Sequence, residues 1–82
     1  MVYGRVQGVN YRYSAKNSAQ SLGISGFAKN MPDGSVYIEA EGSDDALDTF
    51  IEWCRQGPPM ANVSRITTEQ TDPFGHEGFQ IL

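Results

Sequence analysis

The chain has a single cysteine, Cys54, and a single histidine, His76, among its 82 residues. One cysteine cannot form an internal disulfide, and these two residues alone are too few for a structural zinc site. Small folds often depend on such cross-links, because a chain of this length buries only about 60–65% of its unfolded surface. This chain must instead fold through the packing of its apolar residues, which make up 39% of the sequence. We expect a single domain that spans residues 1–82.

Charge is distributed unevenly along the chain, whose formal net charge is −4. All of its acidic residues lie after residue 30, whereas most of its cations lie before that point. These early cations are Arg5, Arg12, Lys16 and Lys29. A positive segment in an acidic protein can attract a small anion, although chance clustering explains the pattern equally well. The acidic total argues against a nucleic-acid partner, which would require a broad basic surface.

The composition is that of an ordinary folded domain, with 20% charged residues. No apolar run approaches the roughly twenty residues that a membrane-spanning helix requires, so we expect no membrane partner. No basic leader followed by an apolar stretch marks the chain for secretion. We therefore expect a cytoplasmic protein.

Two segments carry apolar residues at helical spacing. The first extends from Tyr11 to Leu22, and the glycine that follows at position 23 suits the end of a helix. The second extends from Leu47 to Cys54, after a capping residue, Ser43. Because Cys54 lies on this apolar stripe, we assign it to the core and not to catalysis.

Alternating apolar residues predict strands around these helices. Residues 24–30 and 35–41 indicate a hairpin, whose turn at 31–34 contains a proline and a glycine. Further strands are predicted at 1–6, at 63–69 with a bulge near Arg65, and at 79–82. The order β-α-β-β-α-β predicts an α+β fold in which an open antiparallel sheet carries two helices on one face.

The segment between the first strand and the first helix is the best candidate for an anion site. Backbone N–H groups at the start of a helix lack partners within it and carry the positive end of its dipole. Gly8 permits a turn in which several such groups converge on one phosphate, and Arg12 can add a bidentate guanidinium contact. These features leave the question open, because strand–glycine–helix junctions with an arginine are common.

Two motifs in the sequence resemble the signatures of the acylphosphatase family. Residues 4–12, GRVQGVNYR, resemble the first signature, and residues 26–36, GFAKNMPDGSV, resemble the second. The resemblance extends from Val2 to Leu82 and implies a ferredoxin-like βαββαβ sandwich. It implies an enzyme that hydrolyses the carboxyl–phosphate anhydride bond of acyl phosphates to a carboxylate and inorganic phosphate. No metal, cofactor or covalent intermediate is implied.

The resemblance also implies a role for individual residues. Arg12 and Asn30 correspond to the catalytic residues: the arginine would bind the phosphoryl oxygens, and the asparagine would orient the attacking water. The backbone of one loop would form the phosphate cradle. Its residues are Gln7, Gly8, Val9, Asn10, Tyr11 and Arg12. The expected partners are a small acyl phosphate and, as ligands of the site, inorganic phosphate or sulfate.

The chain departs from the family pattern at two points. Family members usually have a longer first strand, and Asn10 is more polar than expected within the cradle. We expect a monomer, with a strand-exchanged dimer as the alternative. A non-catalytic module that binds phosphate or an acyl phosphate is the second functional hypothesis. An RNA-binding domain of the same fold is the third, but the aromatic pair needed for base stacking is missing.

The remaining chemically interesting residues are predicted to have structural roles. We expect His76 to be a solvated loop residue. Lys29 could attract the substrate or lie on the outer face of a strand, and we favour the second interpretation. Asp33 is explained by turn chemistry, and Trp53 by partly buried packing.

Overall fold

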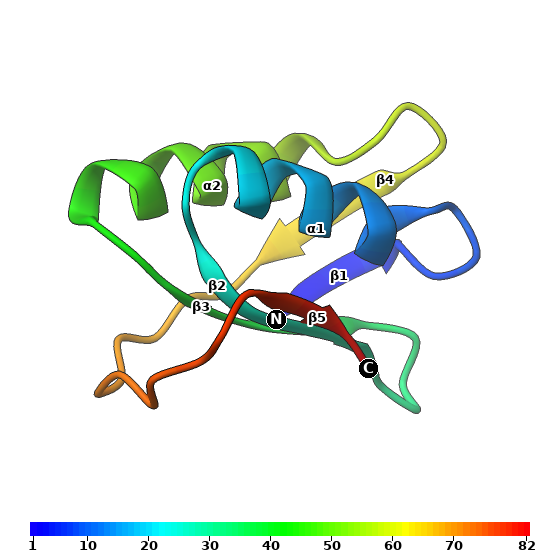
Figure 1. The fold of residues 1–82 in the computed structure, drawn as a ribbon. Coiled ribbons are helices and arrows are strands. Elements are labelled where there is room, and N and C mark those ends of the chain that lie inside the picture. The colour runs from blue at the N-terminus through cyan, green and yellow to red at the C-terminus, as the bar shows by residue number, and fades with distance from the viewer.

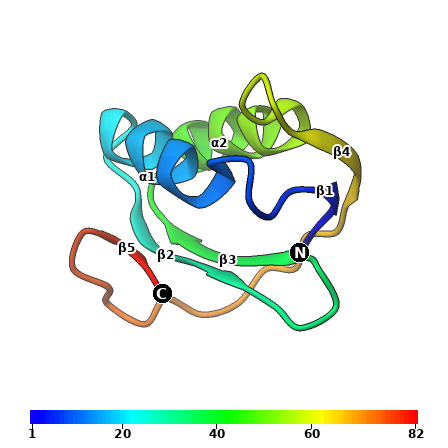
Figure 2. The same cartoon turned by 90° about the vertical axis from the view of Figure 1, so that its right-hand side faces the viewer.

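Two helices pack side by side on one face of a five-stranded sheet in the computed structural model, which describes residues 1–82 (Figure 1). The elements are β1 (Val2–Arg5), α1 (Tyr11–Ser21), β2 (Ser25–Asn30), β3 (Val36–Glu41), α2 (Asp44–Gln56), β4 (Asn62–Ile66) and β5 (Phe79–Ile81). Figure 2 shows both helices on the same side of the sheet and no helix on the other. This arrangement confirms the expected ferredoxin-like α+β fold. Neither helix has the length and apolar character needed to cross a membrane.

The sheet is mixed, and the expectation of a wholly antiparallel sheet is wrong. Its strand order is β4-β1-β3-β2-β5, so β4 and β5 lie at opposite edges. The pairs β1–β3, β1–β4 and β2–β3 are antiparallel, whereas β5 runs parallel to β2. Parallel neighbours need a connection of about a dozen residues or more. The parallel neighbours here are β2 and β5, and the chain between them, which includes β3, α2 and β4, supplies this connection.

The β1–β4 pair also differs in detail from the prediction. β4 ends at Ile66 and not near residue 69. The extra residue in this strand is Ser64, because Tyr3 pairs with Arg65 while Gly4 pairs with Val63. Gly4 has a φ of 124°, and a Cβ atom there would clash with the carbonyl oxygen of Asn62. The bulge therefore lies where the two backbones approach too closely for any other residue.

The core lies between the helices and the sheet. Ala15 and Ala19 of α1 are completely buried, and Phe50 of α2 packs edge-on against Phe79 of β5 at a centroid distance of 5.9 Å. Cys54 is buried, as predicted from the apolar stripe, and burial raises the pKa of its thiol to about 11. Small residues on α1 and large aromatic residues on α2 thus fill the layer between the helices and the sheet.

A buried hydrogen bond joins the two helices. The Tyr11 hydroxyl donates to the carbonyl oxygen of Cys54 at 2.8 Å. Burial, followed by interaction with Cys54, raises the pKa of Tyr11 far above its ordinary value. Tyr11 therefore stays neutral and anchors the first turn of α1 to α2.

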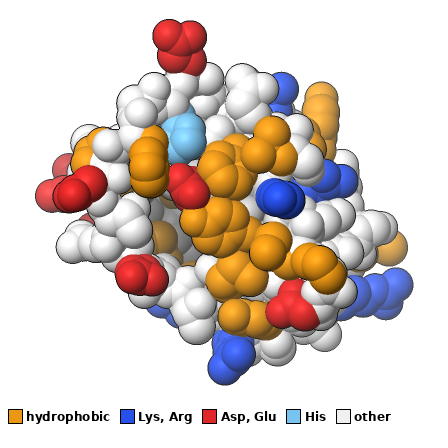
Figure 3. Space-filling model, turned by 90° about the horizontal axis from the view of Figure 1, so that it is seen from below, with side chains coloured by type: hydrophobic (Ala, Val, Ile, Leu, Met, Phe, Trp, Pro, Cys, Tyr) orange, Lys and Arg blue, Asp and Glu red, His pale blue; other side chains and the backbone are white.

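His76 is not the solvated loop residue that we expected. Its side chain is only 23% exposed and lies on the helix-free face of the sheet, which Figure 3 shows from below. Its Nε2 atom lies 3.2 Å from Glu39 Oε1, and its ring stacks edge-on against Phe27. The Glu41 carboxylate accepts hydrogen bonds from the backbone N–H groups of residues 74–76. These contacts hold the loop against β3.

We predict that Tyr11→Phe lowers the free energy of unfolding by about 1–3 kcal/mol, because it leaves the buried Cys54 carbonyl without its side-chain donor. Urea denaturation followed by circular dichroism measures the change. The matched control is Tyr13→Phe, at a tyrosine that is 56% exposed, and it should change stability by no more than about 0.5 kcal/mol. Equal stabilities for the two variants would contradict the proposed anchor.

Candidate active site

The two sequence motifs meet at one end of the sheet. A cavity of about 150 Å³ lies between the loop that follows β1 and the end of β2. Its lining residues are Val6, Gly8, Asn10, Tyr11, Arg12, Tyr13, Asn30 and Ile81. Both predicted catalytic residues, Arg12 and Asn30, are therefore at the same cavity. Of the predicted cradle residues, Gln7 and Val9 do not line it.

The cradle loop is shaped by two residues with left-handed backbone conformations. Gly8 has a φ of 71°, and Asn10 has a φ of 66°. Asparagine adopts this conformation more readily than most other side chains do, which gives a local reason for the polar residue at position 10. A left-handed residue followed by the first residue of a helix turns successive N–H groups toward one point. The backbone thus has the form of an anion-binding nest.

The N-terminus of α1 has no acidic or capping side chain of its own. Asn10 occupies the N-cap position without a side-chain hydrogen bond to the helix, and the first turn contains no acid. By contrast, Ser43 caps α2 with its side chain, and two acids follow it. The positive end of the α1 dipole is therefore not neutralised by the chain and points into the site. Val9, which is buried, fixes this loop to the core.

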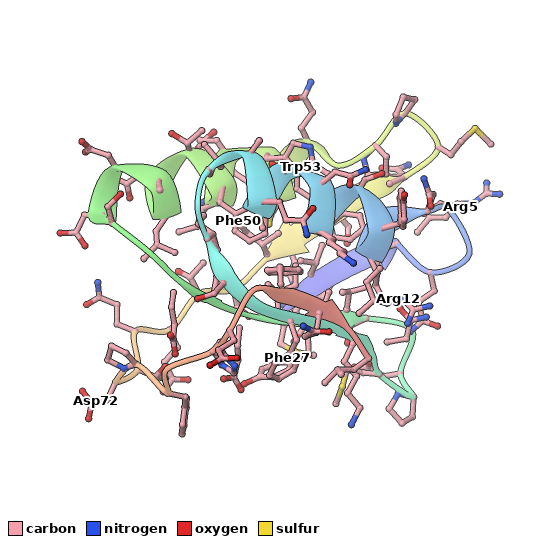
Figure 4. The ribbon with its side chains drawn as sticks, in the orientation of Figure 1. Arg5, Arg12, Phe27, Phe50, Trp53 and Asp72 are labelled. Carbon is pink, nitrogen blue, oxygen red and sulfur yellow. The ribbon has the colours of Figure 1, made fainter.

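Arg12 is held in the first turn of α1 by a contact with the far end of the chain. Its Nη1 atom donates to the carbonyl oxygen of Leu82 at 2.7 Å. Figure 4 shows its side chain beside the end of β5, at the same end of the molecule as Arg5. A guanidinium has five N–H donors, so this contact leaves others free for an anion. The sequence motif gives no sign of the contact, because the two residues are 70 positions apart.

Asn30 is the last residue of β2 and pairs with Val36 of β3. Its Oδ1 atom is buried and has no hydrogen-bond partner within the chain. Buried polar atoms are almost always satisfied, and leaving one without a partner costs about 1–3 kcal/mol. A buried acceptor without a partner beside a small cavity is typical of a group that serves a bound molecule.

Gln7 has a role that the motif alone did not predict. Its side-chain Nε2 atom donates to the carbonyl oxygens of Met31 and Ser35, at 2.8 and 2.9 Å. These oxygens belong to the turn between β2 and β3, which Asp33 closes by accepting from the N–H and hydroxyl of Ser35. The predicted turn role of Asp33 is confirmed. The Gln7 side chain therefore joins the cradle loop to the turn that follows Asn30.

The other early cations are not all part of this site. Lys29 is exposed on the outer face of β2, as expected.

Tyr13 and Ile81 line the cavity, although the sequence did not single them out. Ile81 reaches the cavity only because β5 pairs with β2, a contact that no local pattern predicts.

Comparison with known proteins identifies the family of the chain. The family model described as Acylphosphatase matches residues 1–81. The chain belongs to the acylphosphatase family. It is 42% identical to the acylphosphatase of Thermococcus kodakarensis, covering 99% of this chain and 89% of the relative. It is 48% identical to that of Thermotoga maritima, covering 98% of this chain and 89% of the relative.

Solved structures show the same relationship. The acylphosphatase of Bacillus subtilis matches with a TM-score of 0.94 and 41% identity, covering 99% of this chain and 91% of that one. The full-length HypF structure, in a phosphate- and nucleotide-bound form, matches with a TM-score of 0.91 and 27% identity. That match covers 99% of this chain but only 11% of HypF. Acylphosphatases are hydrolases of acyl phosphates, and the chain has this activity at the level of its family.

We predict that Gln7→Ala lowers kcat about tenfold or more with little change in KM, because small displacements of positioned groups slow catalysis strongly. Hydrolysis of benzoyl phosphate, followed by ultraviolet absorbance, gives both constants. Gln20→Ala, at an exposed position of α1, is the control and should leave both unchanged. An unchanged kcat in Gln7→Ala would show that the bridge has no role in positioning.

Proposed function

We propose that the chain hydrolyses acyl phosphates by direct in-line attack of water on phosphorus, without a metal or a covalent intermediate. The observation that supports this mechanism best is the unpartnered Oδ1 of Asn30 at the cavity that Arg12 and the start of α1 also line. A carboxylate is a good leaving group that needs no protonation near neutral pH. The reaction therefore requires positioning and charge stabilisation, and no general acid.

The phosphoryl group would be bound by the cradle. The free N–H groups at the start of α1 and the Arg12 guanidinium supply hydrogen bonds to its equatorial oxygens, where negative charge accumulates. These donors are held in place before the substrate arrives, by the left-handed residues of the loop and by the Arg12–Leu82 contact. Inorganic phosphate and sulfate present similar oxygens, so we propose both as ligands of the cradle.

Asn30 would hold the attacking water. A carboxamide does not take up protons at working pH, so it cannot be a general base. Its Oδ1 atom can accept a hydrogen bond from water and orient the water on the side of phosphorus opposite the leaving carboxylate. Because every group in this mechanism comes from one chain, we propose that a monomer is active.

We predict different consequences for the two catalytic substitutions. Asn30→Ala should lower kcat by about 100-fold or more while the inhibition constant for inorganic phosphate changes little, since the cradle stays intact. Arg12→Ala should lower turnover about a thousandfold and also abolish phosphate inhibition. Benzoyl phosphate hydrolysis at several phosphate concentrations measures both effects.

Lys29→Ala is the control, because Lys29 precedes Asn30 but lies exposed on the outer face of β2. Wild-type turnover in Asn30→Ala would exclude the assigned role. A folded wild-type chain that binds phosphate without hydrolysing benzoyl phosphate would instead support the non-catalytic binding module.

A further inference from the structure

The leaving carboxylate has no partner in the mechanism proposed above. When water attacks phosphorus, the bond between phosphorus and the bridging oxygen breaks, and its electron pair leaves with that oxygen. The negative charge then spreads over both oxygens of the carboxylate, one of which was the acyl carbonyl oxygen. In the balanced reaction, both protons of the water end on the inorganic phosphate, and none reaches the leaving group. A hydrogen-bond donor beside the acyl carbonyl oxygen would therefore stabilise the charge that develops there.

The acyl group must lie at the mouth of the small cavity. The volume of about 150 Å³ equals that of roughly five molecules of liquid water. It holds a phosphoryl group and the attacking water, and leaves no room for an acyl group as well. The Asn30 Oδ1 atom, which holds that water in the proposed mechanism, is buried. Because the water and the leaving group lie on opposite sides of phosphorus, a buried water directs the acyl group toward solvent.

Two side chains at the mouth carry a hydrogen-bond donor. The exposed residues that line the cavity are Gly8, Asn10, Tyr13 and Ile81. Glycine has no side chain and that of isoleucine is apolar, so the Asn10 carboxamide and the Tyr13 hydroxyl remain. Asn10 is the N-cap of α1, beside the free N–H groups that bind the phosphoryl oxygens. Tyr13 begins about 4.5 Å further along the helix axis, which makes Asn10 the better placed donor.

The Asn10 carboxamide is not used to cap its own helix. An asparagine at the N-cap ordinarily has an extended backbone and accepts a hydrogen bond from the second or third N–H group of the helix. Asn10 has a φ of 66° and a ψ of 23° instead, and its side chain makes no such bond. Both the helix N–H groups and the carboxamide are therefore left for a ligand. Glycine adopts this conformation with less strain, so backbone geometry alone does not account for the carboxamide.

We propose that Asn10 is a further catalytic residue, whose side-chain Nδ2 atom donates a hydrogen bond to the acyl carbonyl oxygen as the carboxylate leaves. This inference rests on the proposed hydrolysis and adds the leaving-group contact to it. Asn30 and Asn10 then act at opposite ends of the reaction axis: the first accepts from the attacking water, and the second donates to the acyl group. The contact recognises a carbonyl group that every acyl phosphate has and that phosphate monoesters of alcohols lack.

The test compares the full 82-residue chain with Asn10→Gly, which permits the left-handed backbone and removes the carboxamide. The substrates are 4-methoxybenzoyl phosphate and 4-nitrobenzoyl phosphate, whose hydrolysis is followed by ultraviolet absorbance. The nitro group withdraws electrons, so its carboxylate depends less on a donor. We expect kcat to fall about tenfold or more for the methoxy substrate and by a smaller factor for the nitro substrate. The inhibition constant for inorganic phosphate, which has no acyl group, should change by less than about twofold.

Two further variants accompany this comparison. Asn17→Ala is the matched control, because it removes a carboxamide from an exposed position of α1 that does not line the cavity. It should leave the constants for both substrates unchanged. Tyr13→Phe removes the other side-chain donor at the mouth. A leaving-group-dependent loss in Tyr13→Phe, with wild-type kinetics in Asn10→Gly, would assign the contact to the tyrosine hydroxyl and overturn the proposal.

The remaining outcomes separate this inference from the function on which it rests. An equal fall in kcat for both substrates, with weakened phosphate inhibition, would show that Asn10 only shapes the cradle, and would overturn its catalytic role. Wild-type kinetics in Asn10→Gly, beside an active wild-type chain, would overturn that role and leave the proposed hydrolysis standing. A folded wild-type chain without turnover on either substrate would overturn both.

Discussion

The two hydrogen bonds from Gln7 to the β2–β3 turn connect the parts of the site. β1 and β2 are not neighbours in the sheet, because β3 lies between them. The loop after β1 and the end of β2 therefore meet only beyond the sheet, where no ladder hydrogen bonds fix their separation. Gln7 spans that distance with a single side-chain amide, which donates hydrogen bonds to the carbonyl oxygens of both Met31 and Ser35. The distance between the phosphate cradle and Asn30 depends on this contact.

The folded chain separates its charges in space as well as in sequence. No acidic residue lines the small cavity at the start of α1, whereas six acidic residues line a second, larger cavity between β3, α2 and the segment that follows β4. A site enclosed by backbone N–H groups and one arginine needs no large positive net charge, because local donors act at short range. An acidic protein can therefore bind an anion at one end. The acidic residues on the rest of the surface repel anions there.

Local patterns in the sequence predicted the elements whose contacts are local. The apolar stripes predicted α1 and α2, and alternation around a proline–glycine turn predicted the β2–β3 hairpin with Asp33 in its turn. The two family motifs singled out Arg12 and Asn30, and both residues line one cavity in the structure. The bulge predicted near Arg65 lies next to it, at Ser64. The parallel position of β5 and the burial of His76 were missed, because each depends on segments distant in sequence. The Arg12–Leu82 contact was missed for the same reason, because the two residues are 70 positions apart. The left-handed backbone of Asn10 was also not predicted, although it is a local property that this residue type favours.

The central claim is that the cradle and Asn30 form one phosphate site. Titration of the ¹⁵N-labelled chain with inorganic phosphate tests it most directly, because NMR resolves the backbone amides of residues 8–12 and the side-chain amide of Asn30. We expect both sets of signals to shift together along one binding curve, with no comparable shifts on other surfaces of the chain. Shifts confined to other surfaces, or cradle shifts with an unchanged Asn30 side chain, would contradict the account.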